Sequence, residues 1–293
     1  MKFYIVDAFT ETLFGGNPAG VVILPAGADF PSDEVMVKTA AELRYSETAF
    51  IKRLNESEFN IRYFTPAAEV ELCGHATIGS FKALLAGGYI DDGRTYINHT
   101  LSGDLEIKVE NGFVLMDMAA PVKIGQITEA DALKELYGVM GLDYEAQKAA
   151  GVSLLPQLIS TGLPDIMLPV ASLADLEAIA PDFPALSALS ERYQVVGVHA
   201  FTTACEDATC HVRNFAPLYD IDEEAATGTS NGALTYYGYL NGFIKSGDDC
   251  RFVQGEKMQR PSVILSHLEA TDAGCSIKVG GSAVMLAEGV IML

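Results

Sequence analysis

The sequence is poor in positive charge. Its 293 residues include 19 lysine and arginine side chains against 39 aspartate and glutamate side chains, which gives a formal net charge of −20. A surface of that sign repels the phosphates of nucleic acids and the headgroups of anionic lipids. We therefore expect no nucleic-acid partner and no membrane partner.

Long apolar runs are also missing. No uninterrupted apolar segment reaches the roughly 18 residues that a membrane-spanning helix needs. The amino terminus, MKFYIVDAFT, has a stretch before Asp7 that is too short for the apolar region of a signal peptide. We expect a cytoplasmic protein.

The cysteines lack the paired Cys-x-x-Cys spacing of zinc sites, and their number is odd. They are Cys73, Cys205, Cys210, Cys250 and Cys275. We interpret them as reduced thiols, which is the usual state of cysteines in the cytoplasm. With 49% hydrophobic and 20% charged residues, the chain has the composition of a globular protein long enough for two domains.

The sequence is similar to itself. AFIKRLNESEFNIRYFTP (49–66) aligns without gaps with AFTTACEDATCHVRNFAP (200–217). Each segment has two alternating apolar runs around a polar turn, which predicts a β-hairpin. Weaker matches precede and follow in the same order, so the sequence indicates an internal duplication. The alternative is a duplication that was kept only for packing.

An apolar, glycine-entered helix is predicted after each hairpin, in CGHATIGSFKALLAGGYI and in TGTSNGALTYYGYLNGFI. Each half is then an α+β unit in which a β-sheet wraps one helix. We expect a domain at 1–120 and a second at 121–293, with the last strands able to pack back on the first domain. In such a pseudo-symmetric pair the two helix starts would face a shared cleft, where ligand sites tend to lie.

The two predicted helix starts are candidate anion sites. A helix amino terminus presents unpaired backbone N–H groups and the positive end of the peptide dipole, so it attracts a carboxylate or phosphate. The candidate substrate-binding residues are Gly74, Ala76, Gly228, Thr229 and Ser230. The alternative for either helix alone is an N-cap that is satisfied by its own hydroxyl groups.

His75, at the first of these starts, is a candidate catalytic residue. The helix dipole disfavours its cationic form, so we expect a neutral imidazole. A nucleophilic pair with Cys73 is disfavoured, because residues two apart at a helix start point to different sides. Zinc is disfavoured as well, since no second ligand pair completes a tetrahedral site.

Glu47 and Glu224 are the candidate acid–base residues. Glu47 stands just before the first hairpin, and its duplication partner is Val198, so the carboxylate belongs to one half only. A lone acid of this kind can transfer a proton, provided that enclosure raises its pKa; the alternative is a solvated surface glutamate. Glu224, before the second helix, either faces a substrate ammonium or is an ordinary acidic residue near a helix start.

The chain resembles the phenazine biosynthesis PhzF-like family of isomerases and epimerases. The resemblance runs from DAFTETLFGGNPAGVV through SETAFI, RYFTPAAEVELCGHATIG and EEAATGTSNGAL to QGEKMQRPS and VGGSAVML. It implies a diaminopimelate-epimerase-like fold of two similar domains, each a curved, barrel-like mixed sheet around a central helix. It also implies a homodimer that uses neither metal nor organic cofactor, with Glu47 as the residue that moves a proton.

Two positions depart from the family pattern. The family commonly has an aspartate before the TG element, where this chain has Glu224, and a serine after the glycine, where it has Thr229. Related two-cysteine racemases carry their second cysteine where this chain has Thr227, so Cys73 lacks a thiol partner. These differences leave the identity of the substrate open.

From the sequence we expect a cofactor-independent isomerase that moves a proton on a small, amino-acid-like carboxylate, with Glu47 aided by His75 and Glu224. Two alternatives remain. One is an enzyme in which Cys73 is a single base or nucleophile, and the other is a non-catalytic protein that binds or senses a small molecule.

Overall fold

A computed structural model describes residues 1–272 and 274–293 of the chain. The contacts within the chain divide it into unit 1, Met1–Asp117 with Gly280–Leu293, and unit 2, Met118–Val279. The carboxy-terminal segment therefore belongs to the same unit as the amino terminus. Among the described residues, no helix is long and apolar enough to cross a membrane.

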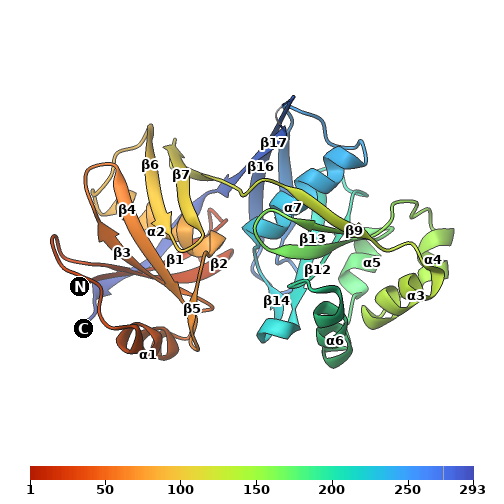
Figure 1. Cartoon of the computed structure of the whole chain (residues 1–293), viewed down its shortest axis with the longest axis horizontal. Helices are drawn as coiled ribbons and strands as arrows, with labels where there is room; N and C mark the ends of the chain where they lie inside the picture. The colour runs from red at the N-terminus through yellow and green to blue at the C-terminus, as the bar shows by residue number, and fades with distance from the viewer. Residues whose placement is uncertain (273) are drawn as a thin grey trace. The chain divides into compact units, whose positions relative to one another are not determined.

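Unit 1 is a mixed β-sheet with two helices (Figure 1). Its strands are β1 (Lys2–Ala8), β2 (Asn17–Ile23), β3 (Thr48–Arg53), β4 (Glu58–Phe64), β5 (Glu69–Val70), β6 (Arg94–Thr100), β7 (Gly103–Glu110), β8 (Phe113–Asp117) and β18 (Ala283–Val290). Neighbouring strands run β18–β1–β2–β3–β4–β6–β7–β8, and β5 pairs with the end of β4. The pairs β2–β3 and β4–β6 are parallel, and the others are antiparallel.

Helix α2 (Gly74–Ala86) is the central helix of unit 1. It contacts β1, β2, β3, β8 and β18, and ten of its 13 residues are buried. Its sequence, GHATIGSFKALLA, is apolar or small on nearly every side, which is the composition of a helix enclosed by other elements. Helix α1 (Asp33–Leu43) instead contacts β3 and β4 and buries only Met36, Thr39 and Ala40.

Unit 2 has the same succession of strand pairings. Its strands are β9 (Val122–Gln126), β10 (Gln157–Ser160), β11 (Pro164–Pro169), β12 (Gly197–Thr202), β13 (Cys210–Ala216), β14 (Ile221–Glu224), β15 (Asp249–Gln254), β16 (Ser262–Thr271) and β17 (Gly274–Gly281). The pairs β11–β12 and β13–β15 are parallel, as β2–β3 and β4–β6 are in unit 1. The predicted hairpins are confirmed as the antiparallel pairs β3–β4 and β12–β13.

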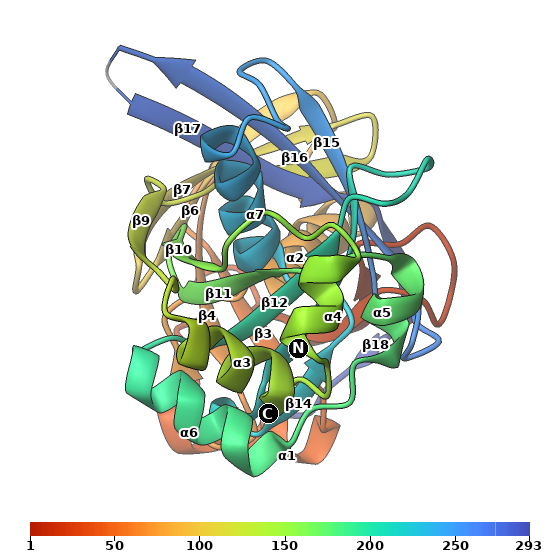
Figure 2. The same ribbon diagram turned by 90° about the vertical axis from the view of Figure 1, so that its right-hand side faces the viewer.

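The helices of unit 2 fall into two groups (Figure 2). Helix α7 (Gly228–Leu240) contacts β10, β11 and β16. The remaining helices are α3 (Ala130–Val139), α4 (Tyr144–Ala149), α5 (Leu173–Ala178) and α6 (Phe183–Tyr193), with a 3₁₀ turn at Pro217–Tyr219. Side chains of α3, α5 and α6 form an apolar core with β11 and β12, apart from the surface that α7 covers.

One arginine in each unit contacts a glutamate and a phenylalanine in the same way. Arg62 on β4 forms a bidentate salt bridge with Glu69 on β5, with N···O distances of 2.7 and 2.5 Å, and its guanidinium lies 5.1 Å from the centre of the Phe64 ring. Arg213 on β13 forms a bidentate salt bridge with Glu223 on β14, with both N···O distances at 2.8 Å, and its guanidinium lies 4.8 Å from the centre of the Phe215 ring. These arginines and phenylalanines are the aligned residues of the two similar segments.

Candidate active site

His75 in unit 1 contacts four polar side chains, those of Asn17, Ser46, Glu47 and Cys73. It is the second residue of α2 and is only 3% exposed. Its Nε2 lies 3.2 Å from Glu47 Oε2 and 3.2 Å from Ser46 Oγ. Its Nδ1 lies 3.2 Å from Asn17 Nδ2 and 3.4 Å from Cys73 Sγ. The predicted catalytic residues Glu47 and His75 are therefore in direct contact.

The Glu47 carboxylate is buried next to the start of β3. It is 9% exposed, and the backbone carbonyl of Glu47 accepts a bond from the Gly20 N–H at 3.3 Å, which fixes the residue beside β2. Although Oε2 is close to His75 Nε2, the contact is not aligned as a hydrogen bond, and no described residue donates one to this oxygen. Buried oxygens without a donor are uncommon, and function is one of the reasons for their persistence.

The electrostatics of the Glu47–His75 pair differ from expectation. Burial raises the pKa of Glu47, but the charge of the nearby His75 ring and the polar contacts with His75, Ser46 and Cys73 outweigh it, so the pKa lies below its usual range. The condition set from the sequence, that enclosure raises this pKa, is not met, because the sequence did not show the imidazole beside the carboxylate. At neutral pH Glu47 is thus ionised and is in the form that accepts a proton.

For His75, burial lowers the pKa, while the contacts with Cys73 and with the Glu47 carboxylate raise it well above the usual range. The prediction of a neutral ring rested on the helix dipole alone, which a carboxylate at 3.2 Å outweighs. The orientation of the Asn17 amide depends on the protonation of His75. An amide N–H that faces Nδ1 requires that nitrogen to be unprotonated. When both ring nitrogens carry a proton, the amide oxygen must face Nδ1 instead.

Cys73 and His75 touch, contrary to the prediction from helical spacing. Cys73 is the N-cap of α2 and has extended backbone angles, φ −138° and ψ 117°, so its side chain does not follow the helix. The thiol is nevertheless a poor nucleophile where it lies. Burial, together with the charge of Glu47, raises its pKa to about 11, and the residue is only 7% exposed.

The second helix start carries Glu224 and the TG element. Glu224 ends β14, and its Oε2 accepts a bond of 2.7 Å from the Thr227 hydroxyl. Thr229 is partly buried, and its carbonyl accepts a bond of 2.8 Å from Thr161 Oγ1. The Ser230 hydroxyl donates to the Asp165 carboxylate and accepts a bond of 3.1 Å from Asn214 Nδ2.

The first turns of α2 and α7 are not capped by the side chains of their N-cap residues, Cys73 and Thr227. In α4, α5 and α6 the N-cap side chain does accept a bond from the first turn. The alternative of hydroxyl groups that cap their own helix therefore fails for both starts. Because α1 and α3 are uncapped in the same way, the feature permits an anion site and does not by itself require one.

Two groups of side chains contain the atom types that bind metal ions. In the first, the ligand atoms of Glu47, Cys73 and His75 all lie within 4.8 Å of one another, and in the second those of Cys205, Asp207 and His211 do. Thiolate formation at Cys73 is opposed by its raised pKa. His211 is already bonded at one nitrogen by Asp207, at 3.0 Å, and at the other by Glu256, at 2.7 Å. The absence of a metal stays a prediction.

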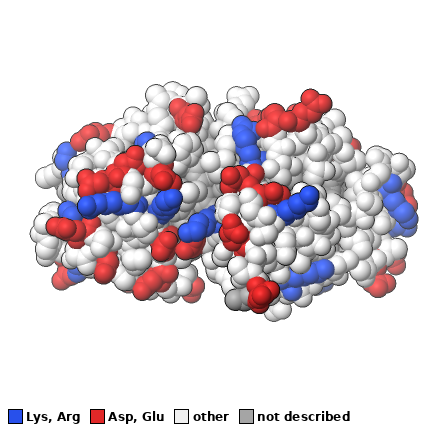
Figure 3. All heavy atoms as spheres, turned by 90° about the horizontal axis from the view of Figure 1, so that it is seen from above, with Lys and Arg blue, Asp and Glu red and all other residues white. Residues whose placement is uncertain are grey.

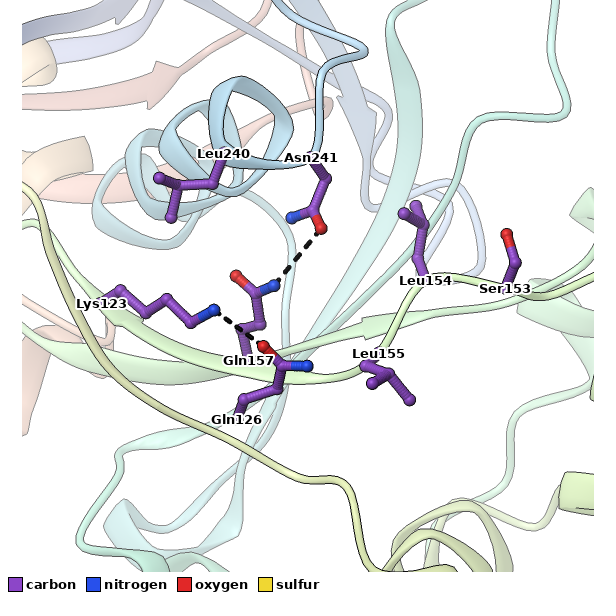
Figure 4. A pocket seen from close by; sticks show the side chains of 8 residues that line it. All are labelled: Lys123, Gln126, Ser153, Leu154, Leu155, Gln157, Leu240 and Asn241. Carbon is purple, nitrogen blue, oxygen red and sulfur yellow. Dashed lines mark hydrogen bonds between the residues drawn. The ribbon is translucent and has the colours of Figure 1, made fainter.

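Unit 2 has a hollow of about 330 Å³ (Figure 4). Its lining comes from β9, the segment before β10, and the end of α7, and it includes a 2.8 Å bond from Lys123 to Gln126 and a 3.4 Å bond from Gln157 to Asn241. None of the predicted site residues lines it. The face in Figure 3 carries both acidic and basic side chains.

Sequence reasoning missed several residues that contact the predicted site. Asn17 lies in the GGNPAGVV stretch and Gln254 in QGEKMQRPS, so both segments stood in the family resemblance without an assigned role. Asp165 and His199 are buried polar residues of unit 2 that gave no signal of their own, because single polar residues in apolar strands are ambiguous. Asn231 lies in the first turn of α7, and its bonds to His199 and Gln254 were not predicted.

Comparison with known proteins places the chain. The family model described as phenazine biosynthesis-like protein, PhzC-PhzF, matches residues 6–289. An uncharacterized isomerase of Clostridium acetobutylicum is 30% identical, over 100% of this chain and 98% of that protein. The trans-2,3-dihydro-3-hydroxyanthranilate isomerase of Pseudomonas chlororaphis is also 30% identical, over 99% of each chain.

A solved structure shows the same fold. The crystal structure of a Bacillus anthracis phenazine biosynthesis protein of the PhzF family has a TM-score of 0.87 with 24% sequence identity, and the match covers 100% of this chain and 99% of that one. The likeness confirms a mixed α/β architecture of this type for the whole chain. At this identity it extends to the fold and not to the substrate.

Proposed function

The chain belongs to the phenazine biosynthesis-like PhzC-PhzF family and is an isomerase, and we propose that it moves a proton on a small carboxylate-bearing substrate with Glu47 as the acid–base residue. We further propose that the reaction needs neither metal nor organic cofactor. The homodimer implied by the family resemblance stays a prediction.

The observation that carries this proposal is the state of Glu47 Oε2. The oxygen belongs to an ionised carboxylate, is buried, and accepts no hydrogen bond from a described residue. Its neighbour His75 supplies positive charge and an N–H group at 3.2 Å. The lowered pKa makes Glu47 a weaker base than a raised one would, but the buried oxygen is ionised at neutral pH and is in the form that accepts a proton from a substrate carbon.

The chemistry of the proposed step balances within the substrate. Glu47 Oε2 takes a proton from a substrate carbon, and the electron pair left behind spreads into the adjoining π-system or carboxylate. The proton then returns to another carbon, which moves a double bond, or to the opposite face of the same carbon, which inverts it. His75 favours the ionised form of Glu47 before the transfer and can hold a proton during it.

The substrate carboxylate would be held by backbone N–H groups at helix starts. The candidates are those of Gly74 and Ala76 on α2 and those of Gly228, Thr229 and Ser230 on α7. Support comes from the uncapped first turns and from the helix dipoles. Glu224 is proposed as a second catalytic carboxylate, which the Thr227 hydroxyl orients.

The experiment that tests Glu47 measures exchange of solvent deuterium into the substrate. The first substrate to try is trans-2,3-dihydro-3-hydroxyanthranilate, because a relative is named for its isomerisation. Glu47→Gln keeps the shape and removes the base, so we expect turnover and exchange to fall by about 10²- to 10⁴-fold. The matched control is Glu42→Gln, which alters an exposed glutamate of α1 and should leave the rate unchanged.

Full turnover in a folded Glu47→Gln variant would remove Glu47 from the mechanism. If no substrate exchanges deuterium with the wild-type protein across a panel of cyclic and linear amino acids and hydroxy acids, proton transfer itself is the wrong reaction for this chain. Retention of activity by Glu47→Gln together with its loss in Cys73→Ala would instead support the single-cysteine alternative.

A further inference from the structure

A network of buried polar side chains surrounds the start of α7. Its members come from four strands and from α7, and none is more than 2% exposed: Asp165, His199, Asn214, Ser230, Asn231 and Gln254. Taking so many polar groups out of water is costly unless they find partners, and hydrogen bonds between such groups hold them in one arrangement. The question is what this arrangement serves.

The first part of the network fixes the proton on His199. Asn214 Nδ2 donates to Ser230 Oγ at 3.1 Å and to His199 Nδ1 at 3.2 Å, while Ser230 donates its own proton to Asp165. Because Nδ1 accepts, the ring carries its proton on Nε2. Burial lowers the pKa of His199 to about 3, so the ring stays neutral through the physiological range.

The second part transmits that orientation to an amide. His199 Nε2 lies 3.4 Å from Asn231 Oδ1 and donates to it. Asn231 must therefore present its NH₂ group on the other side, where it meets the Thr227 carbonyl at 2.9 Å and Gln254 Oε1 at 3.0 Å. A reversed Asn231 amide would set oxygen against oxygen at both contacts.

The last part reaches the predicted site. Gln254 accepts at Oε1, so its Nε2 donates to the Glu224 carbonyl at 2.8 Å and to Thr227 Oγ1 at 3.1 Å. With an acceptor position of its oxygen taken, the Thr227 hydroxyl directs its proton to Glu224 Oε2, at 2.7 Å. Every bond from Asn214 to Glu224 thus has one consistent direction.

We infer that His199, Asn231 and Gln254 are positioning residues, which together turn the Thr227 hydroxyl toward the Glu224 carboxylate and so orient that carboxylate. Nothing in the relatives' names or in the proposed chemistry assigns a task to these three residues. The inference rests on the proposed function only where it gives Glu224 a part in catalysis. The orientation of Glu224 itself can be measured without a substrate.

Two replacements of His199 separate orientation from packing. Glutamine places its amide near the position of Nε2 and can still donate to Asn231, whereas asparagine places its amide near Nδ1 and leaves Asn231 Oδ1 without a donor. Both replacements are polar and smaller than histidine. A residue that only fills space would respond to both in the same way.

The measurement is the carboxyl ¹³C resonance of Glu224 in protein labelled at glutamate, assigned by its loss in Glu224→Gln. We expect the resonance to move in Thr227→Val, to move in the same direction in His199→Asn, and to stay in place in His199→Gln. Circular dichroism and thermal melting establish that each variant is folded. Thr227→Val tests the last bond directly should either His199 variant fail to fold.

An unchanged Glu224 resonance in Thr227→Val or in folded His199→Asn would overturn the inference, as would an equal movement in the two His199 variants. The proposed function fails separately. If the resonance moves as expected while Glu224→Gln keeps full deuterium exchange with substrate, the network orients Glu224 but the reaction does not use it. If the resonance moves as expected and Glu224→Gln also loses deuterium exchange, kcat should fall in His199→Asn and should stay near the wild-type value in His199→Gln.

Discussion

His75 Nε2 lies 3.2 Å from Glu47 Oε2, in a contact between the start of α2 and the residue that precedes β3. His75 is 3% exposed and Glu47 is 9% exposed, so water does not screen the charge of one residue from the other. Each therefore sets the protonation of its neighbour, which lowers the pKa of Glu47 and raises that of His75. The pair makes both the stability and the chemistry of unit 1 depend on pH.

The first prediction concerns that pH dependence. The contribution of Glu47 to stability is present above its unfolded pKa of about 4.5 and is lost as pH falls through the lower folded value. The contribution of His75 is present below its unfolded pKa of about 6.5 and is lost as pH rises through the higher folded value. The two contributions are therefore complete together between these values.

The difference in unfolding free energy between wild type and His75→Gln should accordingly be largest near pH 5.5, at about 3 kcal/mol, and should shrink as pH rises above neutrality. Urea unfolding at a series of pH values measures it. His99→Gln is the control, because His99 forms its ion pairs at the surface, where such pairs contribute little. A difference that is constant with pH would show that His75 is not charged in the folded state.

The second prediction is that the Cys73 thiol is unreactive in the folded protein and is not required for turnover. Its thiol has a pKa of about 11 and is buried, whereas Cys205 and Cys275 are partly exposed. We expect a disulfide reagent such as Ellman's reagent to modify Cys205 and Cys275 in the folded protein and to reach Cys73 only on unfolding. Cys73→Ser should keep turnover within about tenfold of wild type. Rapid labelling of Cys73 that also abolishes activity would favour the single-cysteine mechanism.

The third prediction is that Asp165→Asn stabilises the protein at alkaline pH. Burial raises the pKa of Asp165 to about 6, above the unfolded value of 3.8. Between these values the folded protein holds a proton that the unfolded chain has released, so this group makes stability fall as pH rises. Removing the charge should raise the unfolding free energy at pH 8 by up to about 3 kcal/mol, with little change at pH 4.

The same urea experiment on Asp131→Asn, an exposed aspartate in the first turn of α3, provides the comparison and should show no such gain. Equal stability of wild type and Asp165→Asn at both pH values would mean that the Asp165 carboxylate is fully compensated by Ser230 and its other neighbours.

The sequence predicted the elements that position the site better than it predicted the contacts within it. The hairpins at 49–66 and 200–217 and the helices at Gly74 and Gly228 follow from alternating apolar residues and from glycine at helix starts, which are local signals. The contact of Cys73 with His75 was missed because an extended N-cap residue does not obey helical spacing.

The hydrogen-bond network from Asn214 to Glu224 could not be predicted from the sequence for a different reason. Its members are spread from β11 to β15, and their burial depends on how the strands and α7 pack. Amide orientation and the histidine tautomer are set only by their bonded partners. The prediction of a neutral His75 was wrong for a related reason, since the protonation of His75 and Glu47 depends on the distance between them.

The last prediction concerns the loop that leads to Asn17. Gly16 has φ +61°, and a Cβ atom added there would lie 2.1 Å from the Ala8 carbonyl oxygen. Gly27 also has a positive φ, +77°, but a Cβ there meets nothing within 4 Å. Gly27→Ala should therefore cost only the backbone strain of about 1 kcal/mol, whereas Gly16→Ala must also displace backbone and should cost several kcal/mol in urea unfolding. Since Asn17 contacts His75, Gly16→Ala should lower turnover as well, and equal stability of the two variants would show that the loop adapts freely.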